Sequence, residues 1–251
     1  MIKRIAHTDG IVELRLDRPP VNALNPALVS ELDRALADAE ANGANGVVLS
    51  GRPGLFTAGL DVPALLQLDE RSMREFWTDF FGLLERLARS ELMICAALTG
   101  HSPAGGTVIA LFCDYRVLAK GDYRLGLNEV EVGLVVPPVI QQALARLIGP
   151  YPAERHLLAG RMISTDEALA VGLVDEMVIL SDVVDQSVRW LQSSLDMPAH
   201  ALRQTRALCR ADLAALFDAP GGINTDAFVE GWFDPATQAS LKRLADRLSK
   251  D

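Results

Sequence analysis

Cysteine and histidine are scarce in this chain of 251 residues. The few that occur are Cys95, Cys113, Cys209, His7, His101, His156 and His200. The cysteines lie in apolar or helical contexts, where a thiol behaves as a small hydrophobic group, so we expect buried thiols rather than disulfides or metal ligands. The histidines show no metal-ligand spacing. The sequence therefore predicts no metal site.

Basic side chains are also in short supply, since 24 lysines and arginines face 33 acidic residues, for a formal net charge of −9. Nonspecific nucleic-acid binding needs clustered cations, so we expect no nucleic-acid partner. No apolar run approaches the roughly 18 residues of a membrane-spanning helix, and no leader-like segment opens the chain. We expect no membrane partner and a soluble, cytoplasmic protein. Phosphate-loop and dinucleotide-binding glycine motifs are missing as well.

Hydrophobic residues make up 49% of the chain, enough for a sizeable core. Strand-like and helical patterns alternate over the first two thirds of the chain. The predicted strands cover residues 11–16, 46–50, 92–98, 115–119 and 173–178, and the predicted helices cover 71–89, 139–148 and 153–159. From residue 182 onward the pattern is helical, with breaks at 198 and 219–222 and a last helix over 235–249. This order is typical of a strand-strand-helix core with a helical tail.

Two helix starts carry clear local signals. Asn25 is placed as an N-cap, with Pro26 in the first helical position. Ser164 and Glu167 form a capping-box pattern that opens a short helix, which Gly172 ends.

Two glycine turns stand out as sites for a ligand. The first is Ala58-Gly59-Leu60-Asp61, after the strand at 46–50, and the second is Pro103-Ala104-Gly105-Gly106. Glycine lets a backbone amide approach a ligand closely, because no side chain intervenes. A helix beginning just after Gly106 would add free N–H groups there. Such turns suit a site where negative charge develops.

Glu129 is the candidate acid–base group. It ends the segment Gly126-Leu127-Asn128-Glu129, in an apolar setting where burial would raise its pKa toward the working pH. A solvated surface glutamate is the ordinary alternative for a single carboxylate. Glu131 is its nearest rival, because in an extended segment both side chains would point the same way.

The two turns followed by Glu129 resemble the crotonase (enoyl-CoA hydratase/isomerase) superfamily over roughly residues 11–178. The resemblance implies an α/β fold, a crotonase-like spiral of ββα repeats with a C-terminal helical region that builds trimers. It implies a core with the active site over residues 1–190. Residues 191–251 would form a helical oligomerisation region of the same unit, giving a homotrimer or a dimer of trimers.

By this resemblance the amides of Leu60 and Gly105 form an oxyanion hole, and Glu129 moves the proton. Coenzyme A is part of the substrate, so no separate cofactor is expected. Many crotonases carry a lysine two residues after the aspartate of the first turn, where this chain has Pro63; Arg18, Arg52 and Lys242 are then candidates for the phosphates. The substrate-binding residues implied are Ala58, Gly59, Leu60, Asp61, Val62, Gly105, Asn128, Ala23 and Leu24.

Val108 refines the expected reaction. Hydratases of the superfamily have a second glutamate at this position, and valine cannot accept or donate a proton. One carboxylate can still move a proton from one carbon to another. The segments Asp114-Tyr115-Arg116 and 126–129 resemble mitochondrial-type Δ3,Δ2-enoyl-CoA isomerases, which implies conversion of 3-enoyl-CoA to trans-2-enoyl-CoA in fatty-acid β-oxidation. The alternatives are a hydratase that works with one glutamate or with Glu131, and a catalytically silent acyl-CoA-binding homologue.

Overall fold

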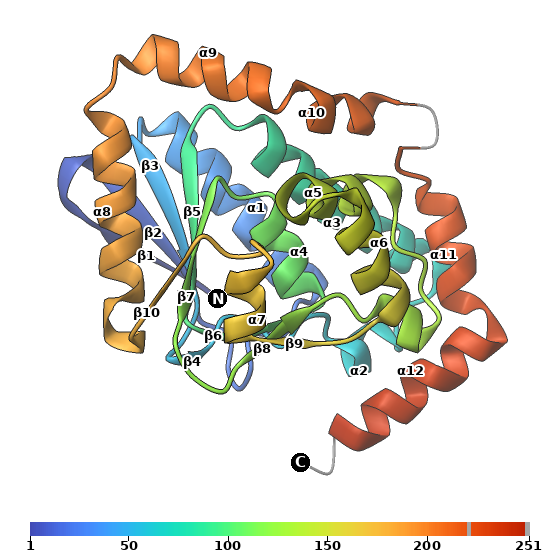
Figure 1. Cartoon of the computed structure of the whole chain (residues 1–251). Coiled ribbons are helices and arrows are strands. Elements are labelled where there is room, and N and C mark those ends of the chain that lie inside the picture. Colours follow the sequence, from blue (N-terminus) through green and yellow to red (C-terminus); the bar gives the residue numbers. More distant parts are fainter. Residues whose placement is uncertain (220–221, 249–251) are drawn as a thin grey trace.

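A large mixed sheet and a smaller sheet beside it organise the chain (Figure 1). The computed structural model describes residues 1–219 and 222–248. In the large sheet the order is β1-β2-β3-β5-β7-β10, and only β1 runs antiparallel to its neighbour. Its strands are β1 (Ile2–Ala6), β2 (Ile11–Leu16), β3 (Gly46–Ser50), β5 (Met93–Leu98), β7 (Tyr115–Ala119) and β10 (Glu176–Val178). The small sheet contains β4 (Gly54–Leu55), β6 (Gly100–Pro103), β8 (Arg124–Gly126) and β9 (Ile163–Ser164).

The chain repeats a strand-strand-helix unit. Each unit places one strand in the large sheet, the next in the small sheet, and then a helix: β3-β4-α3, β5-β6-α4 and β7-β8-α5. The helices in these units are α3 (Glu70–Arg89), α4 (Gly105–Leu111) and α5 (Pro138–Ile148). Parallel strands require such crossovers, because a short turn cannot return the chain to the same end of the sheet. The predicted spiral of ββα repeats is confirmed.

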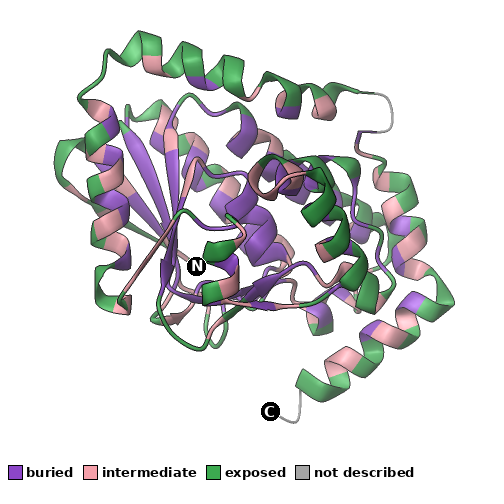
Figure 2. Cartoon of the chain, in the orientation of Figure 1, coloured by how far each residue is buried: buried purple, intermediate pink, exposed green. Residues whose placement is uncertain are grey.

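The large sheet separates two apolar layers, so strands such as β3 and β5 are buried on both faces (Figure 2). Val47 and Leu49 face the main core, which α1 (Pro26–Ala41) and α3 help to form. Val48 and Cys95 face the other layer, which α8 (Val183–Leu195) covers. This burial explains the continuous apolar runs in the sequence, because nearly all residues of such a strand are shielded from solvent.

The predicted helix starts are confirmed. The Asn25 side chain accepts a hydrogen bond from the Leu28 amide at 2.9 Å at the start of α1. Ser164 likewise accepts from the Glu167 amide at 3.2 Å at the start of α7 (Thr165–Ala170). The Glu167 carboxylate pairs with Arg161.

After α6 (Pro150–Ala159), α7 and β10, the rest of the chain is helical. It forms α8, α9 (Ala199–Cys209), α10 (Ala211–Asp218), α11 (Thr225–Phe233) and α12 (Pro235–Leu248). A buried ion pair at 2.9 Å between Arg206 and Asp114 fixes α9 to the core. Helix α11 packs on α3, and α12 packs on α2 (Val62–Leu65). Residues 220–221 of the predicted break and residue 249 of the predicted last helix lie outside the described ranges.

Three expectations about the fold need correction, and one strand was missed. Strand β1 was not predicted, and the strand expected over 173–178 covers only 176–178, because a turn occupies the preceding residues. Helix α4 begins at Gly105 rather than after Gly106. Cys95 and Cys113 are buried as expected, but Cys209 is exposed on the outer face of α9. The predicted division at residue 190 falls inside α8 and stays a prediction.

The remaining elements are short 3₁₀ helices, η1 (Thr8–Gly10), η2 (Glu129–Val132) and η3 (Leu180–Asp182). Across residues 1–219 and 222–248, no helix is both long and apolar enough to cross a bilayer.

Candidate active site

The small sheet brings the two glycine turns together. Strands β4 and β6 are parallel neighbours, so the turns that follow them leave the same edge of the sheet. Gly59, with φ of +81°, lies against the second turn: a Cβ there would stand 3.0 Å from the Pro103 carbonyl oxygen and 3.7 Å from the Gly105 nitrogen. Only glycine allows this approach, for both its backbone conformation and the space available.

Two backbone N–H groups are left free by this arrangement. Leu24 donates to the Gly59 carbonyl at 2.7 Å and accepts from the Asp61 amide at 2.9 Å, which directs the intervening Leu60 N–H away from Leu24. Gly105 is the first residue of α4, so its N–H has no acceptor within the helix. In the part of the chain that the structure describes, neither N–H has a protein acceptor. Both can therefore donate to a ligand.

The segment before α4 is held in an unusual conformation. Ala104 has φ of 45° and ψ of −113°, a region that L residues adopt at a cost of about 1–3 kcal/mol. The Ala104 amide donates to the Gly126 carbonyl at 2.8 Å, which ties this turn to β8 and to the segment that leads to Glu129.

Arg18 and Asp61 fix the first turn from outside. Asp61 caps α2 by accepting from the Ala64 amide at 3.1 Å, and its other oxygen lies 2.7 Å from the Arg18 guanidinium. Arg18 also donates to the Ala23 carbonyl at 2.9 Å. Arg18 is thus committed to neighbouring groups of the protein, and its suitability as a phosphate ligand is lower than the sequence implied.

Glu129 is the first residue of η2, directly after the segment that follows β8. Its Oε2 atom is buried and has no hydrogen-bond partner within the described ranges. Burial raises the pKa of Glu129 to about 7, because an apolar environment disfavours the ionised form. A carboxyl group with this pKa can both accept and return a proton near neutral pH.

Glu129 shares one small, partly open cavity of about 30 Å³ with the two free amides. The Leu60 and Gly105 residues line it, as does Val108 on α4. The other lining residues are apolar: Trp77, Phe80, Phe81, Leu134, Pro137, Ile140 and Phe228. The structure therefore gathers the three predicted catalytic residues around one apolar cavity. Among the described residues that line it, Glu129 is the only one with an ionisable side chain.

Glu131 lies elsewhere, and the expectation that it would point the same way as Glu129 is wrong. The two residues belong to a 3₁₀ helix rather than an extended segment, so their side chains diverge. Glu131 is exposed and lines an outer groove of about 680 Å³ together with Asn128. The Asn128 side chain donates to the Glu131 carboxylate at 3.5 Å.

Two basic side chains that were not predicted as ligand contacts line that outer groove. Arg243 and Arg247, four residues apart on α12, line it, whereas the candidate Lys242 does not. Their i, i+4 spacing places both arginines on one face of the helix. This spacing was the signal in the sequence that could have identified them. They are candidate contacts for an anionic group.

The implied substrate-binding residues differ in how they could touch a ligand. Ala58 is exposed, whereas the side chains of Ala23, Leu24 and Val62 are buried in the core. The last three can present only backbone groups to a ligand. Their role stays a prediction.

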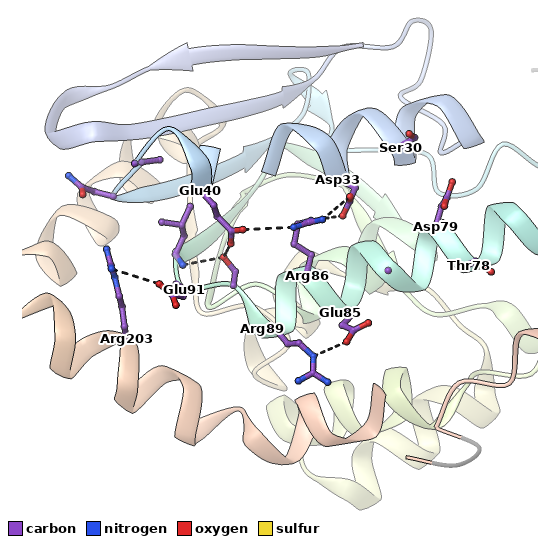
Figure 3. Close-up of a pocket in the computed structure, with 16 residues that line it drawn as sticks. Ser30, Asp33, Glu40, Thr78, Asp79, Glu85, Arg86, Arg89, Glu91 and Arg203 are labelled. Atoms are coloured by element: carbon purple, nitrogen blue, oxygen red, sulfur yellow. Dashed lines mark hydrogen bonds and ion pairs between the residues drawn. The ribbon is translucent and has the colours of Figure 1, made fainter. Parts of the chain in front are cut away.

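A larger groove of about 880 Å³ lies between α1, α3 and α9 (Figure 3). Charged residues line it and pair with one another: Arg86 with Asp33 at 2.6 Å, and Arg89 with Glu85 at 2.8 Å. Neither the glycine turns nor Glu129 contribute to it. In residues 1–219 and 222–248, no group of three or more histidine, cysteine or acidic side chains is placed to hold a metal ion.

A spiral of ββα units, with two glycine turns meeting beside a buried glutamate, defines a crotonase-fold protein. A model of the family described as enoyl-CoA hydratase/isomerase matches residues 6–229, and the chain belongs to this family.

Relatives and solved structures agree with the family. The chain is 33% identical over 245 residues to human mitochondrial enoyl-CoA delta isomerase 1, covering 96% of this chain and 81% of that protein. It is 32% identical to a Mycobacterium avium protein named "Probable enoyl-CoA hydratase", covering 84% and 80%. The crystal structure of human mitochondrial delta3-delta2-enoyl-CoA isomerase superposes with a TM-score of 0.94 at 31% identity, covering 99% and 98%. Relatives of nearly equal identity thus carry the names of both reaction types.

Proposed function

We propose that this protein is a Δ3,Δ2-enoyl-CoA isomerase, which converts 3-enoyl-CoA to trans-2-enoyl-CoA in fatty-acid β-oxidation. One observation carries the proposal: the cavity that holds the two free amides has a single carboxylate, Glu129, and the apolar Val108 where a hydratase would need a second one. The similarity to the human isomerase, in sequence and in structure, supports it.

In this mechanism the thioester oxygen accepts hydrogen bonds from the Leu60 and Gly105 amides. Glu129 removes a proton from C2, so the C2–H bond breaks and its electrons spread over a dienolate. The two amides stabilise the negative charge on the oxygen. Glu129 then delivers the same proton to C4, which leaves a double bond between C2 and C3. Coenzyme A takes part only as a portion of the substrate, and no other cofactor is required.

Hydration is the competing reaction, and the cavity disfavours it. Adding water needs a group to orient and activate the water molecule, and Val108 can do neither. We expect absorbance of the conjugated thioester to rise when the protein is given a 3-enoyl-CoA and to stay constant with a 2-enoyl-CoA. Loss of absorbance with the second substrate would establish a hydratase. No change with either would favour an acyl-CoA-binding protein without this chemistry.

The activity should depend on pH through Glu129. Proton removal from C2 requires the ionised carboxylate, and its pKa is about 7. We expect kcat/KM to fall about tenfold for each pH unit below that value and to level off above it. Initial rates between about pH 5 and pH 9 measure this, with the stability of the protein checked at each pH. A flat profile across this range would contradict a proton shuttle by Glu129.

We also propose that the protein is a cytoplasmic homotrimer or dimer of trimers. On α6, the exposed side chains of Tyr151 and Leu158, at 67% and 73%, are candidates for contacts between subunits. The mass measured by sedimentation decides the oligomeric state.

A further inference from the structure

Four aromatic rings line the candidate cavity. Trp77, Phe80 and Phe81 come from α3, and Phe228 comes from α11. The Phe228 ring centroid lies 4.7 Å from that of Trp77 and 5.4 Å from that of Phe81, edge-to-face in both cases. Helix α11 packs on α3, and Figure 1 shows it beside one end of that helix. The C-terminal region thus completes the wall of the candidate active site.

The cavity inside this wall is small. With a volume of about 30 Å³, it leaves little free space beside Glu129. With the thioester oxygen on the two amides, C2 and C4 must both reach Glu129. The aromatic rings line the same cavity as Glu129 and therefore bound the space that this cavity offers to carbons beyond C4.

The four rings are not equally fixed. Trp77, Phe80 and Phe81 are at most 3% exposed and belong to the main core. Phe228 is half-buried, and its helix packs on the core from outside. Moving a core ring would disturb close packing on several sides, whereas a half-buried ring can move toward solvent. Phe228 is therefore the part of the wall that an entering acyl chain displaces first.

We propose that Phe228 forms the end of the acyl pocket and limits the length of the acyl chain that the protein binds. The proposal rests on the proposed acyl-CoA function and adds the length of the acyl group. Longer chains must displace Phe228 from its contacts with Trp77 and Phe81, and that loss offsets the gain from burying further methylenes.

The test is the binding of saturated acyl-CoAs, which needs no turnover. Isothermal titration with butanoyl-, hexanoyl- and dodecanoyl-CoA should show that the native protein binds dodecanoyl-CoA no more tightly than hexanoyl-CoA. In Phe228→Ala we expect dodecanoyl-CoA to bind at least about tenfold more tightly than in the native protein, because each buried methylene contributes about fourfold. Phe228→Leu keeps more of the apolar packing, so it should give a smaller gain in dodecanoyl-CoA affinity. This variant replaces Phe228→Ala in the test if the alanine variant does not fold.

Phe217→Ala is the matched control. Phe217 is also a half-buried ring on a C-terminal helix, α10, but it packs on Phe112 with centroids 6.0 Å apart and does not line the cavity. Its loss should leave the chain-length profile unchanged. Three results would overturn the proposal. They are an equal gain in dodecanoyl-CoA affinity in this control, no gain in the Phe228 variants, and a native affinity that rises steadily with chain length up to dodecanoyl-CoA. Length-limited binding without isomerisation would instead refute only the proposed reaction.

Discussion

Replacing Glu129 by glutamine is expected to lower kcat for isomerisation of a 3-enoyl-CoA by about 100- to 10,000-fold. The amide has nearly the shape of the carboxylate but cannot accept the C2 proton. The cavity lined by Glu129 offers no other ionisable side chain within the described residues, so no neighbour can take over the transfer. The rate of appearance of the conjugated thioester measures the effect.

The same substitution should leave the protein folded and change how its stability depends on pH. The pKa of Glu129 in the folded protein is about 7, against an ordinary value of 4.5, because of burial. The folded state therefore favours the protonated form of Glu129. The resulting contribution to the free energy of unfolding is fully present below about pH 4.5 and is lost as the pH rises through 7. The loss amounts to about 3 kcal/mol. Urea unfolding should show Glu129→Gln more stable than the native protein at alkaline pH.

Glu131→Gln provides the control for chemistry. Glu131 is two residues further along the chain but is exposed in the outer groove. We expect its kcat to stay within about twofold of the native value, since Glu131 does not line the cavity that Glu129 shares with the two amides. Activity retained in Glu129→Gln, or an equal loss in the Glu131 variant, would refute the assignment of Glu129.

Local signals in the sequence predicted much of the fold. Asn25 and Ser164 begin helices because their side chains satisfy free amides, which depends on only a few neighbouring residues. Strand β7 and the buried face of α3 follow from short-range hydrophobic patterns. The pairing of the two glycine turns needed the resemblance to crotonases, because their contact depends on how distant strands are ordered.

Features that depend on long-range packing were not predictable in this way. The direction of Glu131 depends on η2, a 3₁₀ helix with no clear pattern in the sequence. Phe228 joins the wall of the cavity only because α11 returns to pack on α3. The exposure of Cys209 likewise depends on which face of α9 meets the core. Composition and periodicity carry no information about these contacts.

The spacing of the two glycine turns offers the other sharp test. The proposed oxyanion donors are backbone amides, so no side-chain substitution deletes them, but Gly59→Ala should separate them. The new Cβ would lie 3.0 Å from the Pro103 carbonyl oxygen, which is tighter than an ordinary contact, so the second turn must shift by a few tenths of an ångström away from the first. We expect kcat to fall about 100- to 1,000-fold, the effect of losing one oxyanion donor. Steady-state kinetics with a 3-enoyl-CoA measure it.

Gly54→Ala separates this effect from simple backbone strain. Gly54 has φ of +84°, close to the +81° of Gly59, but a Cβ at Gly54 would meet no atom within 4 Å. Both variants should therefore lose about 1–2 kcal/mol of folding free energy for the left-handed conformation. Only Gly59→Ala should also lose turnover, because only its Cβ pushes the turn that carries Leu60 away from Gly105. Equal activity in the two variants would mean that the rate does not depend on the spacing of these amides.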